Sequence, residues 1–86
     1  MITVLISHEV DDVAHWLGMK TRKEVFGSLG MRVRTFVDPA KTNRVGLIVE
    51  TPSLEALQKL LASPEAAAAM KADGVRPATI SMLVES

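Results

Sequence analysis

His8 and His15 are the only side chains in this sequence whose ordinary pKa suits proton transfer near neutral pH. His8 follows a β-branched run and shares the alternation of Val4 and Ile6, so we expect it to point toward the buried side of a strand. That placement makes His8 the candidate catalytic residue, acting as a general base. The alternative interpretation is a structural histidine at a strand end, hydrogen-bonded to the backbone.

His15 and Trp16 are neighbours that face different ways in a predicted helix. At 100° per residue His15 lies about 200° from Val13, away from the apolar stripe, so we expect it to face water. Trp16 lies on that stripe, either as a core residue or as the wall of a ligand pocket. We predict that a small-molecule pocket on the helix-facing side of the sheet is bordered by His8, Trp16, Thr35 and Met82.

Other catalytic and metal-binding patterns are absent from the sequence. It has no Cys, which excludes a disulfide framework and thiolate chemistry. Ser7 and Ser81 have no partners spaced for nucleophile activation, and no glycine-rich loop has the context that a phosphate requires. The acidic and His residues between 8 and 15 match no metal-ligand spacing, so we interpret Asp11 and Asp12 as a helix cap and expect no metal site.

The basic residues do not form a binding patch. Lys plus Arg and Asp plus Glu number 10 each, so the net charge is zero and we expect no nucleic-acid partner. Arg34 lies in the middle of a predicted strand, where it needs a carboxylate, a carbonyl or a ligand anion as its partner; we favour an ion pair with Glu50 or Glu85. The remaining basic residues of this part of the chain are interpreted as a solvated face: Lys20, Arg22, Lys23 and Arg32.

The length of 86 residues predicts one domain, residues 1–86, because a chain of this size supports one hydrophobic core. Hydrophobic residues make up 48 % of it, which excludes a disordered chain. No signal peptide is visible, and no apolar run approaches the ~18 residues of a membrane span. We therefore expect a cytoplasmic protein without a membrane partner.

Hydrophobic alternation predicts four strands, at residues 2–10, 31–37, 44–50 and 78–84. A first helical region begins at the Asp11-Asp12 cap and has a weak centre, where we expect a break. A second begins at Thr51 or Ser53, restarts at Ser63-Pro64 and ends at Gly74. The order is βαββαβ.

This order predicts an α+β, ferredoxin-like fold: a four-stranded antiparallel sheet with both helical regions on one face. The other face then has no cover, yet its side chains are too apolar to be left in water. A second copy of the chain would cover it, giving a homodimer in which two sheets close a barrel. The alternative is a monomer with an apolar sheet face. The predicted dimer-interface residues are Leu5, Arg34, Phe36, Ile48 and Leu83.

Short motifs along nearly the whole chain support a family resemblance. They are Val10-Asp11-Asp12 before Trp16, Asp38-Pro39, Asn43-Arg44-Val45, Glu50, Ser53-Leu54-Glu55-Ala56, Ser63-Pro64-Glu65, Met70-Lys71 and Gly74-Val75. With them the chain resembles the dimeric α/β-barrel superfamily, a ferredoxin-like group that includes antibiotic-biosynthesis monooxygenases and small cyclase-like proteins. The resemblance implies a homodimer with a pocket in each subunit between the helices and the sheet.

Some members of that superfamily oxidise polycyclic phenols with oxygen and no cofactor, and others degrade haem with a strand Asn, a Trp and a His. This chain has His8 where that Asn is expected and no His in its second half, which argues against haem. The resemblance thus implies a cofactor-independent, monooxygenase- or cyclase-like enzyme acting on a small apolar or aromatic molecule. The alternative is a non-catalytic homodimer that binds a small molecule or serves as an interaction module.

Overall fold

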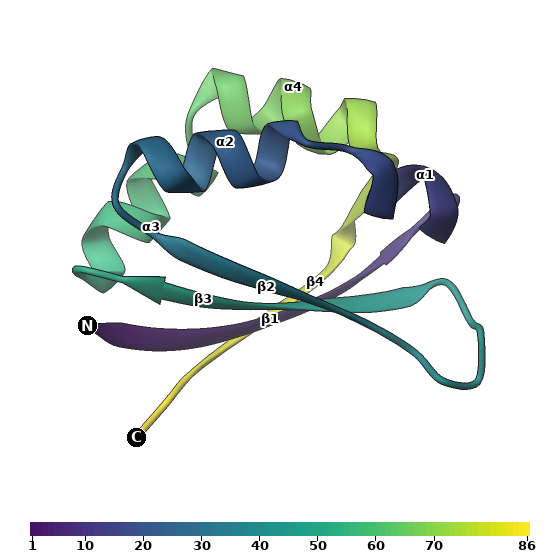
Figure 1. Ribbon diagram of the computed structural model, residues 1–86, viewed down its shortest axis with the longest axis horizontal. Coiled ribbons are helices and arrows are strands. Elements are labelled where there is room, and N and C mark those ends of the chain that lie inside the picture. The colour runs from purple at the N-terminus through teal and green to yellow at the C-terminus, as the bar shows by residue number, and fades with distance from the viewer.

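The computed structural model describes residues 1–86 and consists of one antiparallel sheet with all helices on one face (Figure 1). The strands lie side by side in the order β2-β3-β1-β4. They are β1 (Ile2–Val10), β2 (Arg32–Val37), β3 (Arg44–Thr51) and β4 (Val75–Val84). The helices are α1 (Val13–Gly18), α2 (Thr21–Ser28), α3 (Leu54–Leu61) and α4 (Pro64–Asp73). The predicted ferredoxin-like fold is confirmed, with each helical region divided in two.

Local capping explains where these helices begin and end. The side chains of Asp12, Ser53 and Ser63 each accept a hydrogen bond of 3.1–3.2 Å from a backbone N–H three residues later. Pro64 follows its cap in the first turn of α4, and Gly74 ends that helix in a left-handed conformation with φ of 76°. No helix has the length and apolar character that crossing a membrane requires.

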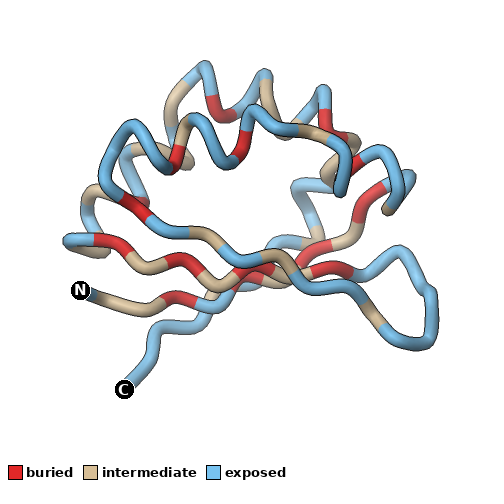
Figure 2. The backbone as a smooth tube through the Cα atoms, viewed as in Figure 1, coloured by how far each residue is buried: buried red, intermediate tan, exposed pale blue.

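The core lies between the sheet and the helices because side chains alternate across the two central strands. Val4, Ile6, His8 and Val10 of β1 are all buried, whereas Leu5 is 44 % exposed on the opposite face. Figure 2 shows the same alternation of buried and more exposed residues along the strands. The buried apolar cluster consists of Val4, Ile6, Val10, Trp16, Phe26, Met31, Val45, Leu47, Val49 and Leu57.

The edge strand β4 departs from regular pairing beside His8. Ser7 of β1 pairs with Ser81, but Glu9 pairs with Arg76, so β4 advances five residues while β1 advances two. The resulting bulge contains Pro77, which has no N–H to give to a ladder and is tolerated on an edge strand. Strand β4 was predicted to begin at Ala78, but it begins at Val75, because the sequence pattern did not reveal the bulge.

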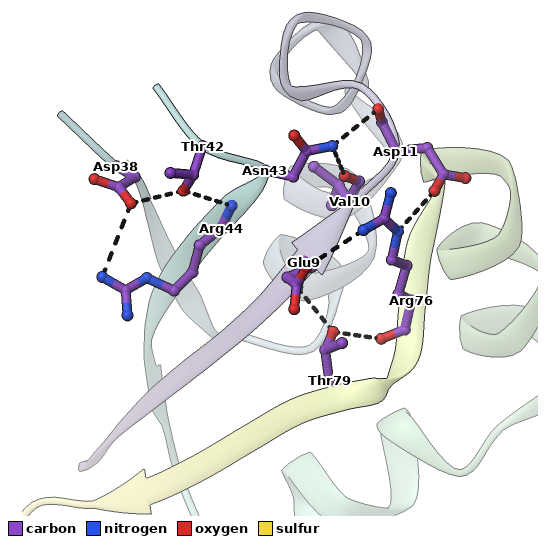
Figure 3. Close-up of polar contacts among 9 residues, drawn as sticks. All are labelled: Glu9, Val10, Asp11, Asp38, Thr42, Asn43, Arg44, Arg76 and Thr79. Carbon is purple, nitrogen blue, oxygen red and sulfur yellow. Dashed lines mark hydrogen bonds and ion pairs between the residues drawn. The ribbon is translucent and has the colours of Figure 1, made fainter. Parts of the chain in front are cut away.

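Polar contacts hold both the bulge and the end of β1 in place (Figure 3). Thr79 Oγ1 accepts a hydrogen bond from the Glu9 N–H at 2.8 Å and donates to the Arg76 carbonyl at 2.6 Å. The Arg76 guanidinium lies 3.3 Å from Glu9 Oε1 and 2.9 Å from Asp11 Oδ1. Asn43 Nδ2 donates to the Val10 carbonyl at 2.7 Å. These contacts fix the strand end that carries His8.

The sheet face without helices carries the residues predicted for a dimer interface. Phe36 is 44 % exposed and Leu83 is 65 % exposed on this face. The ion pair expected between Arg34 and Glu50 or Glu85 is not formed, and the Arg34 guanidinium instead lies 5.9 Å from the centroid of the Phe36 ring. The β2–β3 register explains this difference, because it places Glu50 opposite Arg32 and Ile48 opposite Arg34.

We predict that Thr79→Val lowers the free energy of unfolding by about 1–3 kcal/mol, because it leaves the Glu9 N–H without its acceptor. Urea denaturation followed by circular dichroism measures the change. Thr21→Val is the matched control, since Thr21 is exposed at the start of α2 and its side chain makes no hydrogen bond. Equal stability of the two variants would contradict a structural role for the Thr79 hydroxyl.

Candidate functional site

An apolar cavity of about 190 Å³ lies between the helices and the sheet. Twelve of its 15 lining residues are hydrophobic, and they come from β1, β3, β4 and all four helices. The three polar lining residues are His8, Arg22 and Asp73. Ile80, on the irregular strand β4, lines the cavity and is 37 % exposed.

His8 lies on this cavity with only 5 % of its surface exposed. Its ring meets that of Trp16 edge to face, with the centroids 5.7 Å apart and the planes at 78°. Its Nδ1 atom is buried and has no hydrogen-bond partner. Burial is the largest cause of a His8 pKa below the ordinary 6.5; the cation of Arg22 acts in the same direction, whereas the Glu9 backbone and the Asp73 carboxylate act against it. The imidazole is therefore neutral at neutral pH, the form that accepts a proton.

Arg22 and Asp73 form a buried ion pair beside His8 and Trp16. The Nη1–Oδ2 distance is 3.4 Å, and each side chain is 7 % exposed. Arg22 Nη2 also donates to the Trp16 carbonyl at 3.2 Å, and the guanidinium carbon lies 4.1 Å from the centroid of the indole. Arg22 is therefore a rigid cation that covers one face of Trp16.

The burial of Arg22 corrects the prediction that it belongs to a solvated basic face. The chain leaves α1 in an extended conformation at Met19 and starts α2 after Lys20, which resets the helical phase. In the new phase Arg22 and Phe26, four residues apart, both point toward the sheet.

Desolvation dominates the electrostatics of this ion pair. Burial raises the pKa of Asp73 above 3.8, against the opposing influence of Arg22. Burial also lowers the pKa of Arg22, which remains a cation at neutral pH. One hydrogen bond joins the two side chains, and both Arg22 Nε and Asp73 Oδ1 are buried without a partner.

Comparison with known proteins gives a likeness of fold. No family model and no curated protein matches the sequence. A Deinococcus radiodurans protein inferred to be an antibiotic biosynthesis monooxygenase aligns over 100 % of this chain and 91 % of its own, with a TM-score of 0.60 and 14 % identity. The protein described here has the same fold as that Deinococcus radiodurans protein. A second structure, described as an antibiotic biosynthesis monooxygenase, aligns over 100 % of this chain and 97 % of its own, with a TM-score of 0.64 and 15 % identity.

These two structures share the ferredoxin-like fold of this chain. Two of the four predicted pocket residues, His8 and Trp16, line the cavity, and the other two do not. Thr35 lies on the edge strand β2, beyond the part of the sheet that the cavity covers. Met82 packs against the core further along β4 than Ile80. Strand parity indicates which face a residue lies on, but not its distance from the cavity along the sheet.

The sequence analysis did not find Arg22 or Asp73 as site residues. Asp73 is the last residue of α4, where the helix dipole disfavours a carboxylate. That unfavourable position was an available signal that Asp73 needs a cationic partner. His15 is exposed, as predicted, and its Nε2 lies 2.9 Å from the Ala72 carbonyl. Nowhere in the chain do three His, Cys, Asp or Glu side chains gather as metal ligands would.

We predict that Arg22→Met lowers the free energy of unfolding by about 3–5 kcal/mol, because it leaves the Asp73 carboxylate buried without its counter-charge. The double variant Arg22→Met/Asp73→Leu should recover most of this loss, since it removes both charges. Urea denaturation followed by circular dichroism measures each stability.

Arg76→Met is the control for this pair, because Arg76 also contacts carboxylates but is 46 % exposed. Its loss should cost much less than the loss of Arg22, because ion pairs in water contribute little to stability. An Arg22→Met protein as stable as the wild type would show that the buried pair has no structural role.

Proposed function

We propose that the protein is an enzyme that abstracts a proton from a small, mostly apolar aromatic molecule, in a monooxygenase- or cyclase-like reaction without a cofactor. One observation carries the proposal: a buried, neutral His8 lines an apolar cavity. The two structures of the same fold, both described as antibiotic biosynthesis monooxygenases, support it.

The chemistry begins when His8 accepts a proton from an acidic CH₂ group of the bound molecule. The remaining negative charge is stabilised by Arg22, whose effect is strong because the apolar lining excludes water. In an oxygenase reaction the carbanion reacts with molecular oxygen as co-substrate. A CH₂ group and O₂ are then converted to a carbonyl group and one molecule of water.

The cavity volume limits the size of the substrate. It is about 190 Å³, somewhat more than the roughly 150 Å³ of an apolar cavity that holds benzene. A compound with one aromatic ring and a short substituent fits this volume. The polycyclic phenols that some superfamily members oxidise are larger, so we propose that this chain acts on smaller rings.

We also propose that two copies associate through the sheet face that bears Leu5, Phe36, Ile48 and Leu83. Leu5, Phe36 and Leu83 are 44–65 % exposed in the single chain, and burying each against a second copy would gain roughly 1–2 kcal/mol. Arg34 has no carboxylate partner in its own chain, so a carboxylate of the second copy could pair with it. A cover for this face would leave the cavity, on the opposite face, accessible.

We predict that His8→Ala lowers kcat by about 10²–10⁴ on any substrate that wild-type protein turns over, the range for loss of a general base. For the wild type, kcat/KM should fall as the pH drops through the His8 pKa, which lies below 6.5, and should level off above it. The direction follows because only neutral imidazole accepts the proton. Steady-state kinetics across pH measures both effects.

His15→Gln is the matched control, because His15 is exposed and Gln can still donate to the Ala72 carbonyl. This variant should keep wild-type turnover and the same pH profile. Full turnover by His8→Ala would overturn the catalytic assignment. If wild-type protein binds a small aromatic compound but converts none, the non-catalytic binding function is favoured instead.

We predict that light scattering at micromolar concentration gives twice the chain mass of 9.3 kDa for the wild type. Phe36→Asp should give the single-chain mass, because it would bury a carboxylate without a partner in the interface. Leu17→Asp is the control, since Leu17 is 49 % exposed on α1, away from the sheet face. A wild-type mass of one chain would contradict the dimer.

A further inference from the structure

Helices α3 and α4 lie on the same face of the sheet but carry inward side chains of different size (Figure 1). On α3 these are leucines, of which Leu57 is fully buried and Leu60 packs against the core. On α4 they include Ala66 and Ala69, which line the cavity. Leucine at either position would offer more apolar surface for burial than the methyl group of alanine. The small side chains of α4 therefore leave space on their side of the cavity.

Helix propensity accounts for only half of the alanine run from 66 to 69. Ala67 and Ala68 are exposed, where alanine is the best helix former and its small size forgoes no burial. Ala66 is only 8 % exposed and Ala69 is partly buried. The α4 residues on the cavity have the spacing of one helix face, and they are Ala66, Ala69, Met70 and Asp73.

An unfilled apolar cavity of this size is unusual inside a protein. Protein interiors are closely packed and contain few voids larger than a water molecule, because the atoms around a void lose van der Waals contacts. The cavity here is about 190 Å³, and a larger side chain on α4 would reduce it. Ala69 lies in the middle of α4, one turn before Asp73 on the same face. Alanine at this position indicates that the space beside it has an occupant.

We infer that Ala69 is a specificity-determining residue, whose methyl group leaves the space that a one-ring ligand occupies. A larger side chain at this position takes the place of the ligand. Ala66, one turn earlier on the same face, bounds the ligand at its other end. This inference rests on the proposed function only in taking the cavity as the ligand site. It assigns the limit on ligand size to a named position of α4.

Toluene binding to Ala69→Leu tests the inference. Ala68→Leu is the matched control, because it makes the same substitution at the neighbouring, exposed position of the same helix. Titration followed by amide chemical shifts measures each affinity. Ala68→Leu should bind toluene as the wild type does, and Ala69→Leu at least about 10-fold more weakly, since its isobutyl group fills the volume of the ring. Equal affinity of all three proteins, or no binding to the wild type, would overturn the inference.

Thermal unfolding without toluene separates kept space from tight packing at residue 69. If the space is empty, Ala69→Leu should melt at a higher temperature than Ala68→Leu, because filling a cavity adds buried contacts. If the neighbours of Ala69 pack tightly against it, leucine overpacks the site and lowers the melting temperature. An Ala69→Leu protein that does not fold, or that melts below Ala68→Leu, would therefore overturn the inference even if it fails to bind toluene.

The failure of this inference and that of the proposed function give different results. Toluene reports the available volume and need not be converted, so its binding is independent of catalysis. Loss of toluene binding by Ala69→Leu, with no aromatic compound ever converted by the wild type, would overturn only the proposed function. Turnover of a one-ring compound that depends on His8 but has the same KM in Ala69→Leu as in the wild type would overturn only the role of Ala69.

Discussion

The two-residue alternation of β1 is the constraint on which the rest of the structure depends. Because β1 pairs with β3 on one side and β4 on the other, its inward residues form the centre of the buried layer. His8 is one of these residues, so it enters a layer that otherwise holds apolar side chains such as Val4 and Ile6. A shift of one residue would place the imidazole in the open and bury Ser7 and Glu9 instead.

Burying polar groups in such a layer costs free energy of folding, and an ion pair between the helices reduces that cost. Arg22 and Asp73 come from opposite halves of the helical layer and neutralise each other there. The charges balance, but the hydrogen bonding is incomplete. Only one hydrogen bond joins the two groups, which together offer several donors and acceptors. The result is a small buried polar cluster beside an apolar cavity.

Local signals predicted most of the fold, and long-range contacts explain what they missed. The alternation of β1 and the caps at Ser53 and Ser63 act within a few residues, so the order of elements could be predicted from sequence. Strand parity predicted the inward side of β1 for His8, and helical periodicity predicted the inward stripe of α1 for Trp16; both residues are buried. The burial of Arg22 could not be predicted because a break between two short helices resets the helical phase. The role of Asp73 could not be predicted because its partner lies 51 residues away. The bulge depends on Thr79 and Glu9, which are 70 residues apart.

Because of the bulge in β4, the cavity wall can change in length without a change in the register of the sheet. Beyond it, Ser81 and the residues that follow pair regularly with β1, whatever number of residues the bulge contains. An insertion or deletion near Pro77 would therefore change the cavity wall beside His8 while leaving the ladder and its alternating faces intact. This short segment of an edge strand is where related sequences could diverge in cavity size during evolution, and where a designer could reshape the cavity without rebuilding the core.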